Sequence, residues 1–274
     1  MLADEMMDNL SVRADKLRGA GLKPYLTVVT TGDNFAGAAF MKSKEKMAKR
    51  IGIEIVHEHF DVLKYKHLVR FHDPIIYQTP VICDEPAEIS LFTGHVSYGD
   101  MDGASMVNCS MLAAGEIPYN APCTAAAVIR ILDRYNVDID GKHVCIIGRS
   151  NSVGRPLARM FEQRDATITL CHSKTPIKTL YDCIYYADII VSATGCKNVI
   201  DMDSIVEYGV EERLCKQTYI DVGISRDENG NIRGDIDPKI LRLCKAYTPV
   251  PGGVGPVTTA VLMEHVIKYF ERQL

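Results

Sequence analysis

The stretch that decides the fold is HVCIIGRSNSVGRP, residues 143–156, in which an apolar run ends in a glycine and a polar turn. A strand, a tight turn and the start of a helix form a phosphate site, because the free N–H groups and dipole of a helix N-terminus favour an anion. The usual G-x-G-x-x-G fingerprint is incomplete here. Only Gly148 is in register, while Ser150 and Val153 occupy the places of the second and third glycines. The stretch predicts a nucleotide-binding turn of unusual composition.

The next strand of the pattern indicates which nucleotide this turn binds. An NAD-specific site carries an acidic residue about 20 residues after the turn, where it binds the ribose hydroxyls. Here the strand ends in Cys171, His172, Ser173 and Lys174, with no acid. Arg149 and Ser173 can instead contact a 2′-phosphate, which favours NADP over NAD. A second interpretation stays open, in which the loop is only a polar turn with a solvated arginine.

Short apolar runs alternate with helical patterns along the whole chain, which is typical of α/β layering. The second half is the more regular, and its runs predict strands buried on both faces of a doubly wound parallel sheet, over 143–148, 166–173, 188–194 and 218–223. The first half predicts strands over 26–31, 53–60 and 74–81, with a helix over 36–52. We therefore predict two α/β domains: residues 1–121, completed by a closing helix over 257–274, and a Rossmann-like domain over 122–256.

The composition and charge of the chain argue against several classes of binding partner. The net charge of -4 gives no electrostatic footprint for nucleic acid or an anionic membrane. The nine cysteines form no C-x-x-C pair, which disfavours disulfides and a zinc ribbon. The segment GDMDG at 99–103 lacks the ligand spacing of a calcium loop, so we expect no metal. With an acidic N-terminus and no run of roughly 18 apolar residues, the sequence predicts a cytoplasmic protein.

Lys44 lies on the wrong face of the helix predicted over 36–52. Most of its basic residues share one side, but at 3.6 residues per turn Lys44 falls in the stripe of Phe40, Met47 and Ile51, which ought to meet the core. Such a lysine either extends to the rim of the domain or is held with a partner facing a cleft. In the second case burial lowers its pKa toward a value useful in proton transfer.

Other polar residues interrupt apolar surroundings in the first half of the chain. Gln78 stands in PIIYQTPV, and Asp100 and Asp102 stand in GDMDG. Taken singly, Gln78 is typical of a hydrogen-bonding residue at a strand end, and GDMDG is typical of a turn. These residues by themselves therefore do not establish a catalytic site.

Taken together, several segments resemble the methylenetetrahydrofolate dehydrogenase/cyclohydrolase family. They follow the family's order over most of the chain, and the proline-glycine segment is the most specific; they are GRSNSVGRP (148–156), ATITLCHSKT (166–175), ADIIVSATG (187–195), IDVGI (220–224), RGDID (233–237) and TPVPGGVGPVTTAVLMEH (248–265). The resemblance implies two domains with an active-site cleft between them, and a homodimer. It also implies hydride transfer from methylenetetrahydrofolate to NADP, followed by hydrolysis of the methenyl product to formyltetrahydrofolate.

The resemblance assigns roles residue by residue. The family's catalytic lysine falls on Lys44, its active-site glutamine on Gln78 and its pterin-contacting aspartate on Asp102. The substrate-binding residues it implies are Phe40, Lys44, Gln78, Asp102, Pro251, Gly252 and Gly253. The cofactor-binding residues are Gly148, Arg149, Ser150, Val153, Gly154, His172, Ser173, Thr194, Gly195, Val222 and Gly223.

The chain departs from the family pattern only on the substrate side. Phe40 replaces the family's tyrosine four residues before the lysine, Thr79 and Val81 replace two leucines, Gly99 replaces a lysine, and the segment after residue 60 is short. Phenylalanine can stack on folate but offers no hydroxyl to position a proton or water. We therefore predict that nucleotide binding is intact. Of the two folate reactions, hydrolysis is the one that these substitutions should weaken more.

Two other functions remain open at this point. The remodelled pocket could serve another pterin or small molecule in the same class of oxidoreductase. Alternatively, the chain could bind nucleotide as a subunit without turnover. The joint presence of Lys44, Gln78 and Asp102 speaks against the second alternative, since a dead site has no physical need for a lysine on an apolar face.

Overall fold

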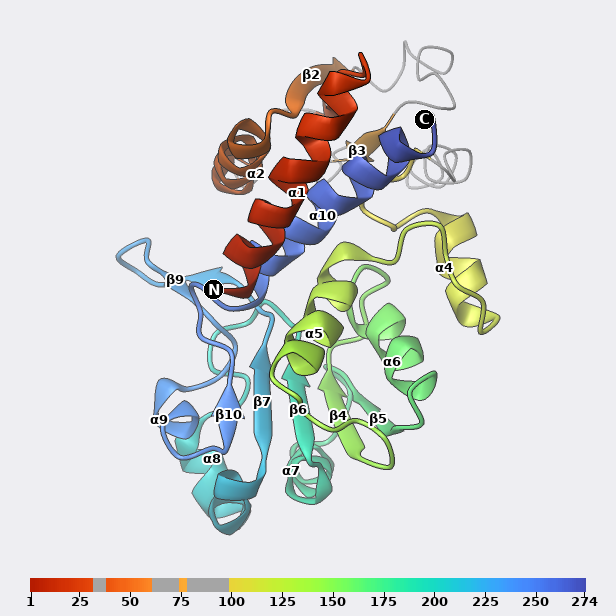
Figure 1. The fold of residues 1–274 in the computed structure, drawn as a ribbon. Helices are drawn as coiled ribbons and strands as arrows, with labels where there is room; N and C mark the ends of the chain where they lie inside the picture. The colour runs from red at the N-terminus through yellow and green to blue at the C-terminus, as the bar shows by residue number, and fades with distance from the viewer. Residues whose placement is uncertain (32–37, 61–73, 78–98) are drawn as a thin grey trace. The chain divides into compact units, whose positions relative to one another are not determined.

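The computed structural model describes residues 1–31, 38–60, 74–77 and 99–274 (Figure 1). The chain divides into two compact units. The first unit is Met1–Cys123 together with Thr258–Leu274, and the second unit is Thr124–Val257. The ligand assigned to each unit from the sequence stays a prediction, as do the domain boundaries.

The first unit contains a three-stranded parallel sheet of order β2-β1-β3. Its strands and helices are α1 (Leu2–Gly19), β1 (Tyr25–Thr31), α2 (Ala38–Ile51), β2 (Glu54–Phe60), β3 (Ile75–Tyr77) and α4 (Met106–Ala113). The strands predicted over 26–31 and 53–60 are present, and so is the helix around Lys44 from Ala38 onward. The strand predicted over 74–81 is present as β3, and residues 78–81 lie outside the described residues. The sequence analysis did not predict α1, although its buried residues recur at helical spacing, at Ala3, Met7, Leu10, Ala14 and Leu17.

Helix α10 (Val254–Glu271) begins in the second unit and ends in the first. Within the first unit it is tied to α1, because the Arg13 guanidinium donates to both carboxylate oxygens of Glu271, at 2.8 and 2.6 Å. No helix in the described part of the chain is long and apolar enough to cross a membrane.

The second unit is a doubly wound sheet of order β10-β7-β6-β4-β5, and all the pairs in it are parallel (Figure 1). Its elements after α5 (Cys123–Arg134) are β4 (His143–Ile147), α6 (Gly154–Glu162), β5 (Thr167–Cys171), α7 (Ile177–Tyr186), β6 (Ile189–Ser192), α8 (Met202–Glu207), the 3-10 helix Glu211–Lys216, β7 (Thr218–Asp221), β8 (Ser225–Arg226), β9 (Ile232–Arg233), α9 (Pro238–Leu241) and β10 (Ala246–Tyr247). The predicted α/β class with a Rossmann-like parallel sheet is confirmed.

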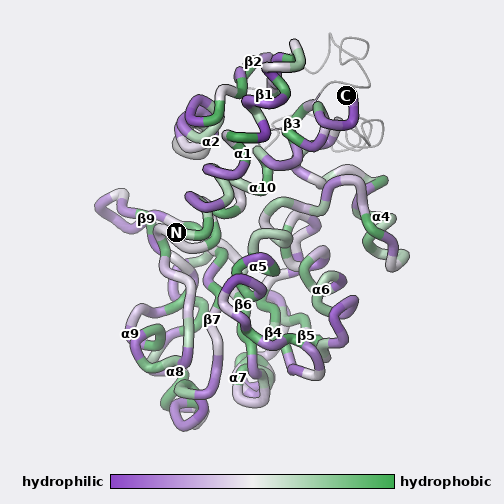
Figure 2. The backbone as a smooth tube through the Cα atoms, in the orientation of Figure 1, coloured by the Kyte–Doolittle hydropathy of each residue, from purple (hydrophilic) through white to green (hydrophobic). Residues whose placement is uncertain are grey.

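One strand differs from the predicted pattern. Strands β6 and β7 are buried along their whole length, but only Cys171 is buried in β5. The reason is position, because β5 is the last strand of the sheet and pairs with β4 alone. Elsewhere in this unit, Figure 2 shows a hydrophilic loop beside β9.

Candidate functional site

The nucleotide turn begins where β4 ends, and two glycines fix its shape. Gly148 has a φ of +115°, and a Cβ on it would lie 2.4 Å from the carbonyl oxygen of Ala193. A Cβ on Gly154, the first residue of α6, would lie 2.0 Å from the carbonyl oxygen of Gly148. Side chains are excluded at both positions, so the backbone itself forms the turn, as phosphate binding requires.

The side chain of Ser150 stabilises this turn. Its hydroxyl accepts from the backbone N–H of Val153 at 3.2 Å and of Gly154 at 3.5 Å. Arg155 reaches back and donates from Nε to the carbonyl of Arg149 at 3.2 Å, while the Arg149 side chain is exposed. The serine in the place of the second glycine thus caps the start of α6, and Arg149 stays available to solvent and ligand.

The end of β5 carries the residues predicted to contact a 2′-phosphate. His172 is partly exposed and Ser173 is exposed. His172 Nδ1 accepts from the backbone N–H of Lys174 at 3.2 Å, so in the neutral ring the proton lies on Nε2, which becomes a donor. The four residues 171–174 therefore offer hydrogen-bond donors and no carboxylate.

The carboxyl ends of β6 and β7 carry the remaining cofactor candidates, namely Thr194, Gly195, Val222 and Gly223. The two ends are joined by the bond from Val222 N–H to the carbonyl of Ser192, at 2.8 Å. Two buried aspartates, Asp221 and Asp235, hydrogen-bond the backbone here. Sequence reasoning did not select them, although both lie in segments, IDVGI and RGDID, that carry the family resemblance.

The candidates Pro251, Gly252 and Gly253 lie in a turn of the second unit between β10 and α10. Gly252 has a φ of +106°, which favours glycine. Gly253 donates from its N–H to the carbonyl of Pro249 at 2.8 Å, and a Cβ on it would lie 2.5 Å from that oxygen. Each glycine of this turn is thus needed for the backbone path.

Lys44 lies on α2 in the first unit and is partly buried, whereas Lys42, Lys46 and Lys49 on the same helix are exposed. Burial lowers the pKa of Lys44 below its ordinary value of 10.5, while the negative charge of Asp102 acts in the opposite direction. The helix therefore brings one lysine toward acidic groups and leaves the others in solvent. The partial burial and the charge of Asp102 favour the second alternative of the sequence analysis, while the cleft that this lysine would face stays a prediction.

Asp102 stands in a rigid loop built around Asp100. The Asp100 carboxylate accepts from the N–H groups of Gly103 and Ser105, at 3.0 and 2.7 Å, and from Asn108 Nδ2 at 2.9 Å. Gly103 has a φ of +72°, and a Cβ there would lie 2.5 Å from the backbone of Ala121. Asp100 is thus the structural member of the pair, and it fixes the backbone that presents Asp102.

The environment of Asp102 couples it to Lys44. Burial raises the pKa of Asp102 above 3.8, whereas the Lys44 charge and a hydrogen bond from the Cys123 thiol lower it. Burial likewise raises the pKa of the Cys123 thiol well above its usual range, so the thiol stays protonated and serves as a donor. Lys44 and Asp102 are consequently two groups whose protonation states depend on each other.

Two residues missed by sequence reasoning support this loop from distant parts of the chain. His265, on α10, donates from Nδ1 to the carbonyl of Met101 at 2.8 Å, and Cys123 Sγ lies 3.3 Å from the same oxygen. The backbone N–H of Cys123 also donates to the carbonyl of Asp102 at 3.0 Å. No local pattern in the sequence links positions so far apart.

Some of the predicted site residues lie outside the described residues. Gln78 directly follows the last residue of β3, Tyr77, and is itself not described. The same holds for Thr79 and Val81. Phe40 lies within α2, but its side chain is outside what the structure describes. The substrate-binding roles of Gln78 and Phe40 thus rest on the sequence.

Comparisons with known proteins identify the family. The family model described as the NAD(P)-binding domain of tetrahydrofolate dehydrogenase/cyclohydrolase matches residues 122–274. The bifunctional protein FolD of Polaromonas sp. (strain JS666) is 34% identical over 281 residues, covering 99% of this chain and 96% of that protein. The chain belongs to the FolD family.

Solved FolD structures share this fold over the full length of the chain. The bifunctional FolD methylenetetrahydrofolate dehydrogenase/cyclohydrolase of Campylobacter jejuni superposes with a TM-score of 0.85 at 31% identity, covering 100% of this chain and 97% of that one. The Trypanosoma brucei dehydrogenase-cyclohydrolase, solved with NADP and an inhibitor, gives a TM-score of 0.85 at 28% identity, covering 99% and 95%. The predicted family is confirmed, together with an NAD(P)-binding domain in the second half.

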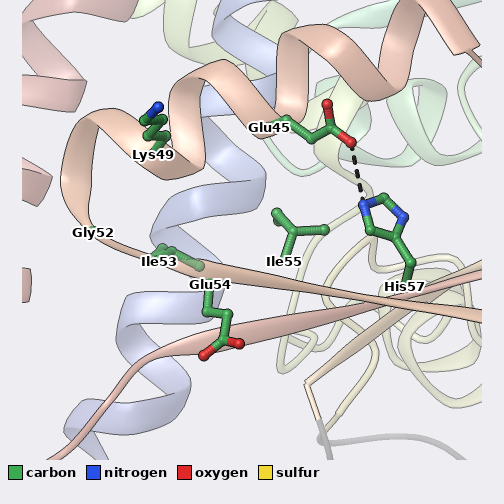
Figure 3. A pocket seen from close by; sticks show the side chains of 7 residues that line it. All are labelled: Glu45, Lys49, Gly52, Ile53, Glu54, Ile55 and His57. Atoms are coloured by element: carbon green, nitrogen blue, oxygen red, sulfur yellow. Dashed lines mark ion pairs between the residues drawn. The ribbon is translucent and has the colours of Figure 1, made fainter.

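One pocket in this FolD-family chain is lined by residues that are not among the predicted site residues. It is an open hollow of about 450 Å³ between α2 and β2, lined by Glu45, Lys49, Gly52, Ile53, Glu54, Ile55 and His57. Figure 3 shows Glu45 and His57 pointing toward one another, with His57 Nε2 3.1 Å from a Glu45 oxygen. Glu45 directly follows Lys44 along α2, but neither Lys44 nor Asp102 lines the pocket.

Proposed function

We propose that this protein oxidises methylenetetrahydrofolate to methenyltetrahydrofolate with NADP and hydrolyses the methenyl product to formyltetrahydrofolate. The observation that carries the proposal is the coupling of Lys44 to Asp102 in a chain that also has the FolD-family nucleotide turn. A partly buried lysine with a lowered pKa suits proton transfer, and a fixed aspartate suits a pterin ring that presents N–H groups.

The residues of the second unit fit a dinucleotide with a 2′-phosphate. Glycines exclude side chains from the turn at Gly148 and Gly154, which leaves room for a pyrophosphate close to the backbone. The exposed Arg149 and the donors at the end of β5 suit a phosphate dianion, and no carboxylate at residues 171–174 repels it. Bound NADP supplies the acceptor for the hydride from the methylene bridge.

In the hydrolytic step Lys44 is proposed to act as the base. Water adds to the bridge carbon of the methenyl cation and loses one proton to the base. Its second proton ends on the bridge nitrogen whose bond to carbon breaks, and the carbon and the water oxygen are left as the formyl group. Burial lowers the pKa of Lys44, which makes loss of a proton from its ammonium group easier, and the resulting amine can accept the proton from water. Asp102 holds the pterin in place, with its backbone fixed by Asp100 and Cys123.

The direct test is an assay with methylenetetrahydrofolate in parallel with NADP and NAD, following reduced nicotinamide and the absorbing methenyl compound. Reduction with NADP without lasting methenyl signal supports both activities. Accumulating methenyl compound indicates a dehydrogenase whose hydrolysis is weakened. No reduction with either cofactor, by folded protein that binds NADP, would overturn the proposal in favour of another substrate or a non-catalytic subunit.

The choice of NADP over NAD has its own test. Arg149→Ala should reduce the affinity for NADP and leave that for NAD nearly unchanged, because one charge-assisted phosphate contact contributes about 1.5–3 kcal/mol. Arg159→Ala is the matched control, since Arg159 is an exposed arginine of the same unit that pairs with Glu162. Equal affinities of the unaltered protein for NADP and NAD would exclude the assignment.

We also propose that the protein is a homodimer, as the family resemblance implies, and that it works in the cytoplasm, as its acidic N-terminus and short apolar runs predict. Light scattering of the purified protein during size-exclusion chromatography tests the dimer. A mass of one chain, 30.4 kDa, over the full concentration range would exclude it.

A further inference from the structure

A buried carboxylate, Asp235, holds the turn that follows β6. Its Oδ2 accepts from the N–H and hydroxyl of Thr194, at 2.7 and 2.9 Å, from Ser192 Oγ at 2.9 Å and from the N–H of Gly195 at 3.3 Å. The Thr194 hydroxyl in turn accepts from the N–H of Cys196 at 3.1 Å. One oxygen therefore collects four hydrogen bonds and sets the path of residues 192–196.

The other oxygen of the same carboxylate is in a very different state. Asp235 Oδ1 is buried and has no hydrogen-bond partner among the described residues. It lies against Gly223, where a Cβ would come within 1.7 Å of it. A buried acceptor without a partner opposes folding. The free energy of folding alone therefore does not explain why all four hydrogen bonds go to Oδ2 and none to Oδ1.

A second buried aspartate fixes Asp235 itself. Asp221, the last residue of β7, accepts from the N–H groups of Asp235 and Ile236, at 3.0 and 3.1 Å. A Cβ on Gly234 would lie 2.0 Å from Asp221 Oδ2. The segment that carries Asp235 is therefore anchored to the end of β7, and the position of its carboxylate is determined by the sheet.

The turn that Asp235 holds borders the cofactor crevice. The strand order reverses between β4 and β6, and dinucleotides bind at the carboxyl ends of the strands at such a point. The carbonyl of Ala193 approaches Gly148 of the nucleotide turn, at 2.4 Å from the position of its absent Cβ. The proposed function puts the adenosine 2′-phosphate at the end of β5, so the β6 and β7 half, with this turn, is left to meet the nicotinamide side.

We propose that Asp235 is a positioning residue that fixes the Ala193–Gly195 turn against the nicotinamide half of the dinucleotide. This inference rests on the proposed cofactor function of the second unit. Asp235 acts through the turn, since its carboxylate is buried and makes no contact with solvent. The adenosine half, bound by other residues, should be insensitive to it.

The test measures the binding of two ligands to Asp235→Asn by isothermal titration calorimetry. NADP contains both halves of the dinucleotide, whereas adenosine 2′,5′-bisphosphate contains only the adenosine half. The amide keeps the size of the side chain but weakens the acceptor. We expect the affinity for NADP to fall about tenfold and that for adenosine 2′,5′-bisphosphate to change less than twofold. An equal loss for both ligands, or no loss for either, overturns the proposal.

Two further variants guard against a trivial result. Ser192→Ala removes one donor to Asp235 Oδ2 from a fully buried strand residue, and should give the same selective loss at smaller size even where Asp235→Asn does not fold. Asp201→Asn alters a helix cap of the same unit, whose carboxylate accepts from Ser204 N–H at 2.8 Å, and should change neither affinity. A selective loss with Asp201→Asn, or none with Ser192→Ala, counts against the inference.

The unaltered protein separates this inference from the proposed function. If it binds neither ligand, the cofactor assignment fails and the inference fails with it. If it binds both and Asp235→Asn lacks the selective effect, only the inference fails.

Discussion

The two candidate sites are built in different ways. The nucleotide turn of the second unit is made of backbone, with Gly148 and Gly154 excluding side chains within seven consecutive residues. The Lys44 site of the first unit is made of side chains that come from four separate places in the chain, at 44, 100–103, 123 and 265. A backbone site is therefore visible in a short stretch of sequence, whereas a side-chain site is assembled by the fold.

The charged groups of the two sites also have different roles. In the first unit two ionisable groups, Lys44 and Asp102, influence each other's pKa by charge, and burial shifts the pKa of both. In the second unit the buried carboxylates of Asp221 and Asp235 bind backbone N–H groups, and so maintain shape. Substitutions should consequently affect chemistry in the first unit, and affinity or stability in the second.

The largest effect is expected at Lys44. Lys44→Met should slow methenyl hydrolysis by about 10²–10⁴-fold, the usual contribution of a general base. Dinucleotide affinity should stay unchanged, since the nucleotide turn belongs to the other unit. Lys46→Met, on the exposed face of the same helix, is the control. Stopped-flow hydrolysis assays measure both, and an unchanged rate would show that another group is the base.

The next effect concerns stability and pH at Asp221. Burial raises the pKa of Asp221 to about 6 from an ordinary 3.8, so the folded state binds this proton more tightly than the unfolded state. The free energy of unfolding should thus fall by about 3 kcal/mol from this group as pH rises from 3.8 to 6. Asp221→Asn should remove that decline.

Denaturant unfolding at several pH values measures the change at Asp221. Asp227→Asn is the control, because the pKa of Asp227 is lowered and its loss should leave the decline in place. At neutral pH Asp221→Asn should also be less stable, since an amide offers only one acceptor for the two N–H groups of Asp235 and Ile236. A pH profile unchanged by Asp221→Asn would show that the carboxylate does not titrate in this range.

A smaller effect tests the backbone character of the nucleotide turn. Gly154→Ala places a methyl group 2.0 Å from a backbone oxygen, and should destabilise the protein by about 1–3 kcal/mol and weaken dinucleotide binding. Gly19→Ala is a matched helical control, because nothing lies within 4 Å of its Cβ position. Thermal unfolding and calorimetric titration measure the pair. Equal stability and equal dinucleotide affinity of the two variants would mean that the turn can accommodate a side chain at position 154.

The smallest effect is expected at Phe40. Phe40→Tyr restores the hydroxyl that the family carries beside its lysine, and one hydrogen bond of about 0.5–1.5 kcal/mol should raise hydrolysis about two- to tenfold. The oxidation step should change less, since it depends chiefly on holding the two rings together. Measuring the rates of oxidation and hydrolysis in one assay tests this prediction. No gain in hydrolysis would mean that the pocket compensates elsewhere.

Much of the second unit could be predicted from the sequence, because its strands are continuous apolar runs and its turns carry glycine. The exception is β5, whose greater exposure follows from its place at the sheet edge. In the first unit the position of Lys44 on an apolar helix face could be predicted from the neighbouring sequence. Its coupling to Asp102 and Cys123 could not be predicted, because contacts between residues far apart in the chain produce no periodic pattern in the sequence.

The sequence by itself determined the α/β class, the nucleotide turn at Gly148 and membership of the FolD family, because apolar period and glycine placement act within a few residues. Only the tertiary structure decided which polar groups meet. It gave Asp100 a structural role beside Asp102, brought His265 to the carbonyl of Met101, and directed four hydrogen bonds to one oxygen of Asp235. Burial and charge depend on neighbours that only the folded chain brings together.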